Sequence, residues 1–165
     1  MAESDPFALA DRAAAVLAQG TGVDCHDVVI VLGSGWADAA DGLGEVVADV
    51  EMVDLPGFPA PTVGGHRNLV RSVRVGEIAA LILGGRAHLY EGHPADTVVH
   101  GVRTAVAAGC RTVILTNAAG GLNPDWSVGQ PVVIADHLNL TGASPMVGPA
   151  PPDGQAARFV DLTEA

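Results

Sequence analysis

The sequence has no lysine, and its eight basic residues are all arginines, spread along the chain from Arg12 to Arg158. Acidic residues number 19, which gives a formal net charge of -11 at pH 7. Proteins that bind polyanions concentrate basic residues on one surface, so this charge pattern argues against a nucleic-acid partner. An anionic ligand would have to be held by the local geometry of a site rather than by the overall field of the protein.

Cysteines and long apolar runs are also scarce. Cys25 and Cys110 are too few for a disulfide framework and lack the spacing of a metal site, so we expect two small buried thiols in a reducing compartment. The longest apolar runs, such as residues 28–32 and 78–83, are too short to span a bilayer. No basic region precedes an apolar one at the N-terminus, where a secretory signal would have it. These features predict a cytoplasmic protein.

The apolar residues form a pattern in which strands alternate with helices. With 165 residues and 48% hydrophobic content, the chain can bury the core of a single domain, which we predict to cover residues 1–165. Strands that alternate with helices favour an α/β fold with a mixed, largely parallel central sheet flanked by helices. The predicted helices cover residues 4–20, 36–40 and 94–109, and the predicted strands cover residues 28–32, 45–53, 69–75, 77–83, 113–115 and 131–135.

Four polar side chains follow the predicted strand 77–83 within six residues of one another: Arg86, His88, Tyr90 and Glu91. The carboxyl ends of strands are where open α/β sheets bind ligands. Arg86 can donate two hydrogen bonds to one oxyanion, and an imidazole such as His88 can exchange a proton near neutral pH. Tyr90 can cover a sugar, and Glu91 can orient its neighbours. A structural alternative is a polar turn in which Tyr90 packs and Arg86 pairs with Glu91.

A glycine loop, Gly33-Ser34-Gly35, follows the predicted strand 28–32. Its amide groups and the serine hydroxyl can donate to an anion at the start of a helix. The Rossmann fingerprint would require a third small residue at position 38, where Asp38 would repel a pyrophosphate. A single phosphate or another small oxyanion therefore fits better than a dinucleotide, and a purely structural turn remains the alternative.

Three further polar segments have both a functional and a structural interpretation. His66 follows two glycines in a loop and is either a gate over a site or a solvated side chain. Residues 117–121 are small and polar, so they either let a flat ligand or a phosphate approach the backbone or form a tight turn. Asp136 and His137 resemble a catalytic pair, but we favour a structural hydrogen-bonding role for them.

Taken together, these loops carry the resemblance to a known family. The chain resembles the amino-terminal part of the purine nucleoside phosphorylases of the low-molecular-mass, homotrimeric class, and most of all the actinobacterial members. The similarity extends from about Val28 to the end of the chain. The matching segments, in the order in which the family has them, are Leu32-Gly33-Ser34-Gly35, Gly65-His66, Gly85-Arg86-x-His88-x-Tyr90-Glu91-Gly92, Thr116-Asn117-Ala118-Ala119-Gly120-Gly121-Leu122 and Asp136-His137-x-Asn139-Leu140.

The resemblance implies a role for each matching residue. Arg86 and His88 would be the catalytic residues, and Glu91 would orient the groups that bind phosphate. Ribose would contact Tyr90 and, from the neighbouring subunit, Phe159. The resemblance also implies a homotrimer that needs inorganic phosphate as co-substrate and neither a metal nor an organic cofactor. Phosphate would be held by Ser34, by His66 on a closing loop, by Arg86 and His88, and by the backbone of Ala118.

Two features depart from the family pattern. Asn68 stands where the family usually has a glycine two residues after the loop histidine, although asparagine tolerates left-handed backbone better than most residues. Residues 161–164 have the pattern of a helix start, and the family continues well beyond this point with its base-recognising residues. We therefore expect a chain that is truncated at its C-terminal end, carries the phosphate and ribose half of a site and is inactive alone.

Two alternatives to purine nucleoside phosphorolysis remain open at this point. A methylthioadenosine phosphorylase would use the same chemistry on another nucleoside. A truncated, non-catalytic subunit would bind phosphate without turnover. The preference among inosine, guanosine and adenosine depends on residues that the matching segments do not contain.

Overall fold

The computed structural model describes residues 5–60 and 68–150. The chain divides into two units, Met1–Ala118 and Ala119–Ala165, which are considered separately below. The single domain expected over residues 1–165 stays a prediction. His66, Phe159 and the helix start expected at residues 161–164 lie outside the described residues.

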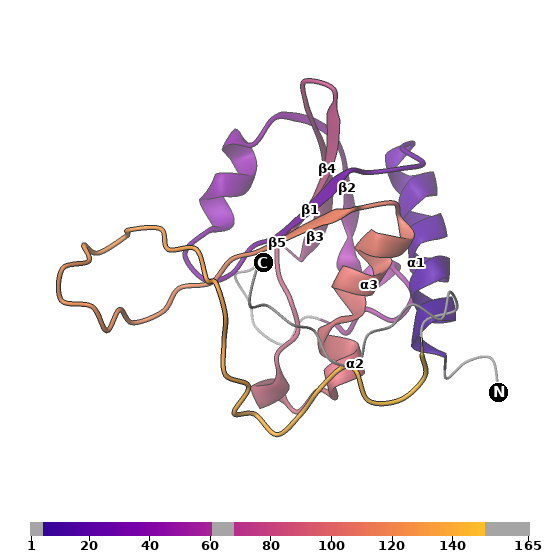
Figure 1. The fold of residues 1–165 in the computed structure, drawn as a ribbon. Coiled ribbons are helices and arrows are strands. Elements are labelled where there is room, and N and C mark those ends of the chain that lie inside the picture. Colours follow the sequence, from indigo (N-terminus) through magenta and orange to yellow (C-terminus); the bar gives the residue numbers. More distant parts are fainter. Residues whose placement is uncertain (1–4, 61–67, 151–165) are drawn as a thin grey trace. The chain divides into compact units, whose positions relative to one another are not determined.

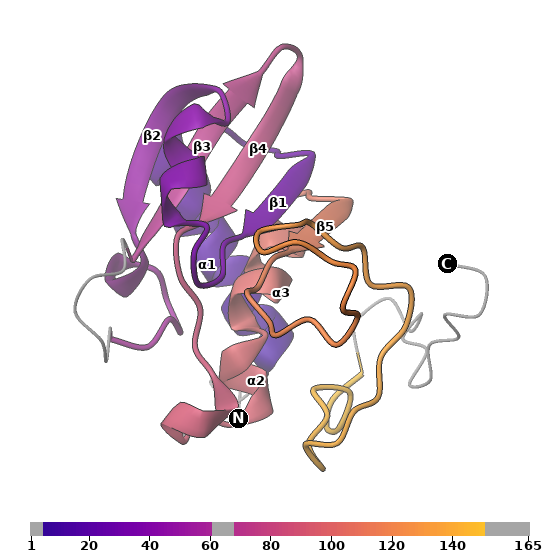
Figure 2. The ribbon, with the colours of Figure 1, turned by 90° about the vertical axis from the view of Figure 1, so that its left-hand side faces the viewer.

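The first unit is built on a sheet of five strands: β1 (Val28–Val31), β2 (Glu45–Glu51), β3 (Leu69–Val75), β4 (Ile78–Leu83) and β5 (Thr112–Leu115). Figure 2 shows their order across the sheet, β2-β3-β4-β1-β5. β1 runs parallel to β4 and β5, whereas β2 with β3 and β3 with β4 are antiparallel. The α/β fold with a mixed sheet flanked by helices, predicted from the sequence, is thereby confirmed.

Three α-helices accompany the sheet: α1 (Pro6–Thr21), α2 (Ala95–Val98) and α3 (His100–Ala107). Asp5 caps α1 by accepting a hydrogen bond of 2.9 Å from the backbone N–H of Phe7. The helix ends at Gly22, which adopts the left-handed conformation and donates to Ala18, so the end predicted at Gly20 was two residues early. Among the described residues, no helix combines the length and apolarity needed to cross a membrane.

Short 3-10 helices replace parts of the predicted elements. The segment after the glycine loop is the 3-10 helix η2 (Ala37–Gly42), and the end of the predicted strand 45–53 becomes η3 (Met52–Asp54). A third, η4 (Leu89–Glu91), lies in the polar stretch after β4. The helix predicted from residue 94 to 109 is divided at Val99, whose ψ angle of 0° departs from the α-helical value.

The strand predicted at residues 131–135 does not form. These residues belong to the second unit, where the described part, 119–150, contains neither a helix nor a strand. Val133 is 95% exposed and Ile134 67% exposed. A strand is stabilised by backbone pairing with a neighbour and by burial of one face. The described part of the second unit provides neither, so an apolar sequence alone does not produce the strand.

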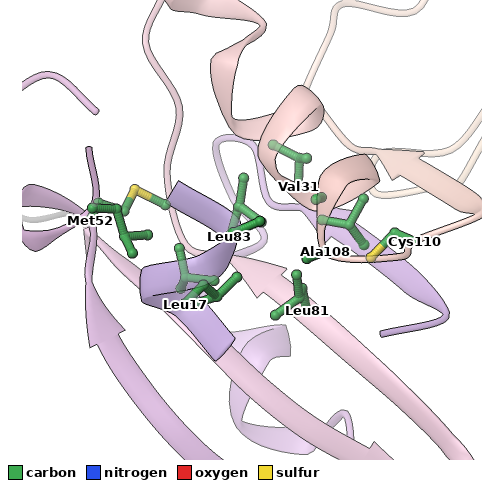
Figure 3. Packing of buried hydrophobic residues seen from close by; sticks show 12 residues of the cluster. Leu17, Val31, Met52, Leu81, Leu83, Ala108 and Cys110 are labelled. Carbon is green, nitrogen blue, oxygen red and sulfur yellow. The ribbon is translucent and has the colours of Figure 1, made fainter. Parts of the chain in front are cut away.

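Alternation along the central strands separates two clusters of buried side chains. Leu81 and Leu83 of β4 pack with Leu17 of α1 on one face, as Figure 3 shows. Ala80 and Ile82, which alternate with these leucines along β4, belong to a second cluster with Ala40 of η2 on the other face. In Figure 1, α1 and α3 lie side by side against the first face. The sheet thus has helical cover on both sides.

The two cysteines differ in environment. Cys110 is buried at 5% exposure, and burial raises the pKa of its thiol to about 12. Cys25 is exposed, so the expectation of two buried thiols was right for Cys110 and wrong for Cys25. Cys25 lies in the segment that enters β1, ahead of the apolar residues that the sheet buries.

Two buried histidines make the stability of the fold depend on pH. His26 donates to or accepts from the hydroxyl of Ser72 at 2.9 Å, and His100 donates to the carbonyl of Pro56 at 2.8 Å. Burial lowers the pKa of both imidazoles below the ordinary value of 6.5, although Asp27 opposes this for His26 and Pro56 opposes it for His100. The unfolded chain therefore binds protons more readily than the folded one.

We expect the free energy of unfolding to decline as the pH falls below 6.5, the ordinary histidine pKa, because protonation then favours the unfolded chain. Thermal unfolding followed by circular dichroism at several pH values from about 7.5 to 5.5 measures this. The variant His26→Gln should show a weaker pH dependence, whereas His137→Gln, at an exposed histidine, should behave as the natural chain. An unfolding midpoint that does not move over this pH range would contradict the expectation.

Candidate functional site

Three loops leave the sheet at the same level, at the carboxyl ends of β4, β1 and β5. In the register of the parallel strands, Val31 lies opposite both Leu83 and Leu115. Val31 leads into the glycine loop, residues 33–35, Leu83 leads into the polar stretch, residues 84–92, and Leu115 leads into residues 116–118. The three loops therefore begin side by side. An edge of this kind, where parallel strands end, is where α/β sheets bind ligands.

The glycine loop is a tight turn that leaves donors available. The N–H of Trp36 donates to the carbonyl of Gly33 at 3.1 Å, and Gly35 adopts a φ of 83°, which a side chain would disfavour. Ser34 is exposed, and its hydroxyl and amide N–H have no hydrogen-bond partner among the described residues. The turn therefore presents polar donors at the sheet edge.

An ion-pair network fixes the 3-10 helix that follows the glycine loop. Arg71 of β3 donates to both carboxylate oxygens of Asp49 on β2, at 2.7 and 3.0 Å, and to Asp41 of η2 at 2.8 Å. The hydrogen bonds to Asp49, and to a smaller extent the one to Asp41, raise the pKa of the Arg71 guanidinium. Arg71 therefore stays positively charged. The network holds η2, and with it the end of the glycine loop, against the sheet.

Arg86 extends from the end of β4 to the end of β5. Its Nη1 donates to the carbonyl oxygen of Thr116 at 2.7 Å. The Arg86–Glu91 pair that the structural alternative required is not formed, because the carboxylate of Glu91 bonds to His88 instead. One edge of the guanidinium is thus held by backbone, and its other N–H groups have no partner within the described residues.

His88 is held in one orientation by Glu91. Oε2 of Glu91 accepts from the backbone N–H of His88 at 2.7 Å and lies 3.2 Å from its Nδ1. Because an ionised carboxylate only accepts hydrogen bonds, the proton of a neutral His88 belongs on Nδ1, which leaves Nε2 as the acceptor. The ring of Tyr90 stacks on His88 with centroids 4.7 Å apart, yet Tyr90 is 83% exposed. Its phenol is therefore accessible.

The loop after β5 contributes backbone rather than side chains. The side-chain amide of Asn117 donates to the carbonyl of Ala118 at 3.3 Å, and the Ala118 N–H has no partner within the part of the chain that is described.

In the second unit, Asp136 accepts a hydrogen bond of 2.7 Å from the backbone N–H of His137. Both residues are exposed, so this local contact fits a structural role and no side-chain relay is formed.

Asn68 causes no backbone strain where the family has glycine. Its carbonyl accepts a hydrogen bond of 2.8 Å from the N–H of Met52, and every non-glycine residue in the described ranges has a negative φ. The substitution is therefore compatible with the conformation of this position.

Sequence reasoning did not assign a role to Gly33 and Thr116 beyond their place in the motifs. A Cβ atom on Gly33 would lie 2.3 Å from the carbonyl oxygen of Thr116 and 2.9 Å from the Cα of Asn117. Only glycine allows the backbones of the two loops to approach this closely. The one signal available in the sequence was a glycine directly after a strand, which a turn explains equally well.

Comparisons with known proteins show the family to which the chain belongs. The family model of the phosphorylase superfamily matches residues 27–165. The purine nucleoside phosphorylases of Cellulomonas sp and Mycobacterium tuberculosis are 53% and 52% identical to this chain over 98% of its length. A solved structure of isoform 2 of purine nucleoside phosphorylase from Schistosoma mansoni, in complex with cytosine and ribose-1-phosphate, has a TM-score of 0.79 at 31% identity over 93% of this chain.

The chain spans only part of these proteins. It covers 56% of the Cellulomonas protein, 57% of the Mycobacterium tuberculosis protein and 54% of the Schistosoma mansoni chain. The family match, by contrast, includes most of the present sequence and each of the three loops at the sheet edge. This chain therefore belongs to the phosphorylase superfamily, and its sequence is that of a relative of the purine nucleoside phosphorylases.

Proposed function

We propose that this chain carries the phosphate and ribose half of a site for the phosphorolysis of purine (deoxy)ribonucleosides. The products are the free purine and (deoxy)ribose 1-phosphate. The observation that carries the proposal is the sheet edge at which the glycine loop and Arg86 both bond to Thr116 while keeping other donors available. The Schistosoma mansoni relative, which has the same fold, was solved with ribose-1-phosphate.

Phosphate would be bound by donors from three loops. Ser34 offers a hydroxyl and an amide N–H, Ala118 offers an amide N–H, and Arg86 offers the edge of its guanidinium that is not bonded to Thr116. Nε2 of His88 would accept a hydrogen bond from the hydroxyl group of a monoprotonated phosphate. His66 would complete the set, as the resemblance to the family implies.

The sugar would lie beside the phosphate. Tyr90, stacked on His88 and largely exposed, is available to contact the ribose, and Phe159 would reach the ribose of a neighbouring subunit. Glu91 orients His88 and thereby the phosphate-binding groups. The site would thus be shared between subunits of a homotrimer in the cytoplasm, with no nucleic-acid or membrane partner.

The chemistry needs little beyond position and charge. Phosphate attacks the anomeric carbon from the face opposite the purine, and the sugar passes through an oxocarbenium-like state. An anionic nucleophile held beside this developing cation stabilises it, and positioning alone can lower the barrier by roughly 7–11 kcal/mol. Phosphate is the co-substrate, and this mechanism requires no metal or organic cofactor.

The names of the relatives favour purine nucleosides over methylthioadenosine as the substrate class. The remaining alternative, a non-catalytic subunit that binds phosphate, is separated by experiment. The 165-residue chain is titrated with inorganic phosphate by calorimetry and then incubated with inosine and phosphate while hypoxanthine release is followed. Size-exclusion chromatography of the same sample reports its assembly.

Phosphate binding together with hypoxanthine release would establish the full activity in this chain. Binding without release would identify a phosphate and ribose half-site that needs further residues for the base. Absence of phosphate binding at millimolar concentration would overturn the proposed function.

A further inference from the structure

Thr116 is bonded to both of the other loops at the sheet edge. Its hydroxyl accepts a hydrogen bond of 2.9 Å from the backbone N–H of Gly33 and donates one of 3.1 Å to the carbonyl of Val31. Its own carbonyl accepts the 2.7 Å hydrogen bond from Arg86. The residue therefore connects the ends of β1, β4 and β5, which are the three strands that carry the proposed phosphate donors.

These contacts use both hydrogen-bonding functions of the hydroxyl. The hydroxyl can donate to Val31 and accept from Gly33 at the same time in only one side-chain rotamer. The two hydrogen bonds therefore fix the distance between the end of β5 and the glycine loop. The close approach at Gly33, where a Cβ atom would meet the Thr116 carbonyl, fixes the same distance sterically. The same Thr116 carbonyl accepts the hydrogen bond from Arg86, so its location also determines where the Arg86 guanidinium lies.

We propose that Thr116 is a positioning residue that sets the spacing between the glycine loop and the Arg86 guanidinium, and thereby the affinity for phosphate. This inference rests on the proposed function, since it concerns the same site. Thr116 does not need to touch the ligand. Its hydroxyl keeps the Ser34 donors, through Gly33, at a fixed distance from Arg86, so the donors are arranged before phosphate arrives.

The substitution Thr116→Val separates the hydroxyl from the shape of the side chain. Valine has nearly the same volume and suits a strand end, but it leaves the Gly33 N–H without its acceptor. Thr116→Ser keeps the hydroxyl and loses only a methyl group. Thr112→Val is the matched control, because Thr112 lies on the same strand and, within the described residues, its hydrogen bonds involve only its backbone.

The experiment measures two quantities on the natural 165-residue chain and the three variants. The first is the dissociation constant for inorganic phosphate, from calorimetry. The second is the hydrogen-exchange rate of the Gly33 amide, from NMR of the 15N-labelled, ligand-free chain. We expect Thr116→Val to weaken phosphate binding by about 10-fold and to speed the exchange of Gly33 by a similar factor. Thr116→Ser and Thr112→Val should stay within about 3-fold of the natural chain in both quantities.

The two readouts separate this inference from the proposed function. If the natural chain binds phosphate and Thr116→Val binds it equally well, the inference is overturned and the proposed function stands. If the natural chain binds no phosphate, the proposed function fails, and the Gly33 exchange alone then decides whether Thr116 holds the loop. Faster exchange in Thr116→Val but not in Thr116→Ser supports that positioning role, and unchanged exchange excludes it.

Discussion

Gly33→Ala is expected to destabilise the first unit by about 2–3 kcal/mol and to abolish measurable phosphate binding. The added Cβ would lie 2.3 Å from the Thr116 carbonyl oxygen, 2.9 Å from the Cα of Asn117 and 3.0 Å from the Thr116 carbonyl carbon. All three are backbone atoms, so no side-chain rotation can relieve the overlap. The ends of β1 and β5 must move apart, and the hydrogen bond from Gly33 to the Thr116 hydroxyl is then lost.

Urea unfolding of the variant and the natural chain measures this effect through the denaturation midpoint. Gly42→Ala is the matched control, because nothing lies within 4 Å of a Cβ built at Gly42 and its φ is not in the left-handed region. Alanine there should be neutral or slightly stabilising. If Gly33→Ala unfolded at the same urea concentration as Gly42→Ala, the close packing of the two loops would be disproved.

Arg86→Ala is expected to weaken phosphate binding by about 10- to 100-fold, the usual effect of losing a hydrogen bond to a charged partner. The guanidinium is half-buried and already bonded to Thr116, so it loses little freedom when it binds an anion. In a chain that completes the purine site, the same substitution should weaken the transition state by about 2–4 kcal/mol. Calorimetric titration with phosphate gives the first quantity, and steady-state kinetics gives the second.

Arg86→Lys tests whether the shape of the guanidinium matters in addition to its charge. A lysine ammonium can bond to the Thr116 carbonyl or to phosphate, but it lacks the planar fork that allows both at once. It should therefore restore only part of the affinity. Arg111→Ala serves as the charge control, because Arg111 precedes β5 and lies at the opposite end of that strand from Thr116. Equal loss of affinity in Arg86→Ala and Arg111→Ala would reduce the role of Arg86 to its net charge.

The chemistry-bearing segments could be predicted from the sequence because each one follows a strand that the sequence identifies by itself. The runs at β1 and β4 are apolar and bounded by glycine or polar residues, so their positions were predicted within one or two residues. The parallel alignment of β1 with β4 and β5 then brings the glycine loop and Arg86 together. Local pattern was sufficient for these parts because burial within one strand determines them.

Features that depend on a neighbour could not be predicted in this way. The apolar run at residues 131–135 has the composition of a strand, yet a strand requires a partner and a covering layer, and its own residues do not specify either. The partner of Arg86 is another example, since Glu91 is closer in sequence but Thr116, 30 residues away, accepts its hydrogen bond. Sequence separation says little about which acceptor a long side chain reaches.

The sequence by itself determined the kinds of chemical group at this sheet edge and the order in which they occur, because these follow from residue identity and from the periodicity of buried strands. Tertiary structure alone decided how the groups are connected. The contact between Gly33 and Thr116 spans 83 residues and exists only because β1 and β5 are neighbours in the sheet. Hydrogen bonds of this kind depend on distances of a few tenths of an ångström between separate strands, and only the folded arrangement of those strands determines such distances.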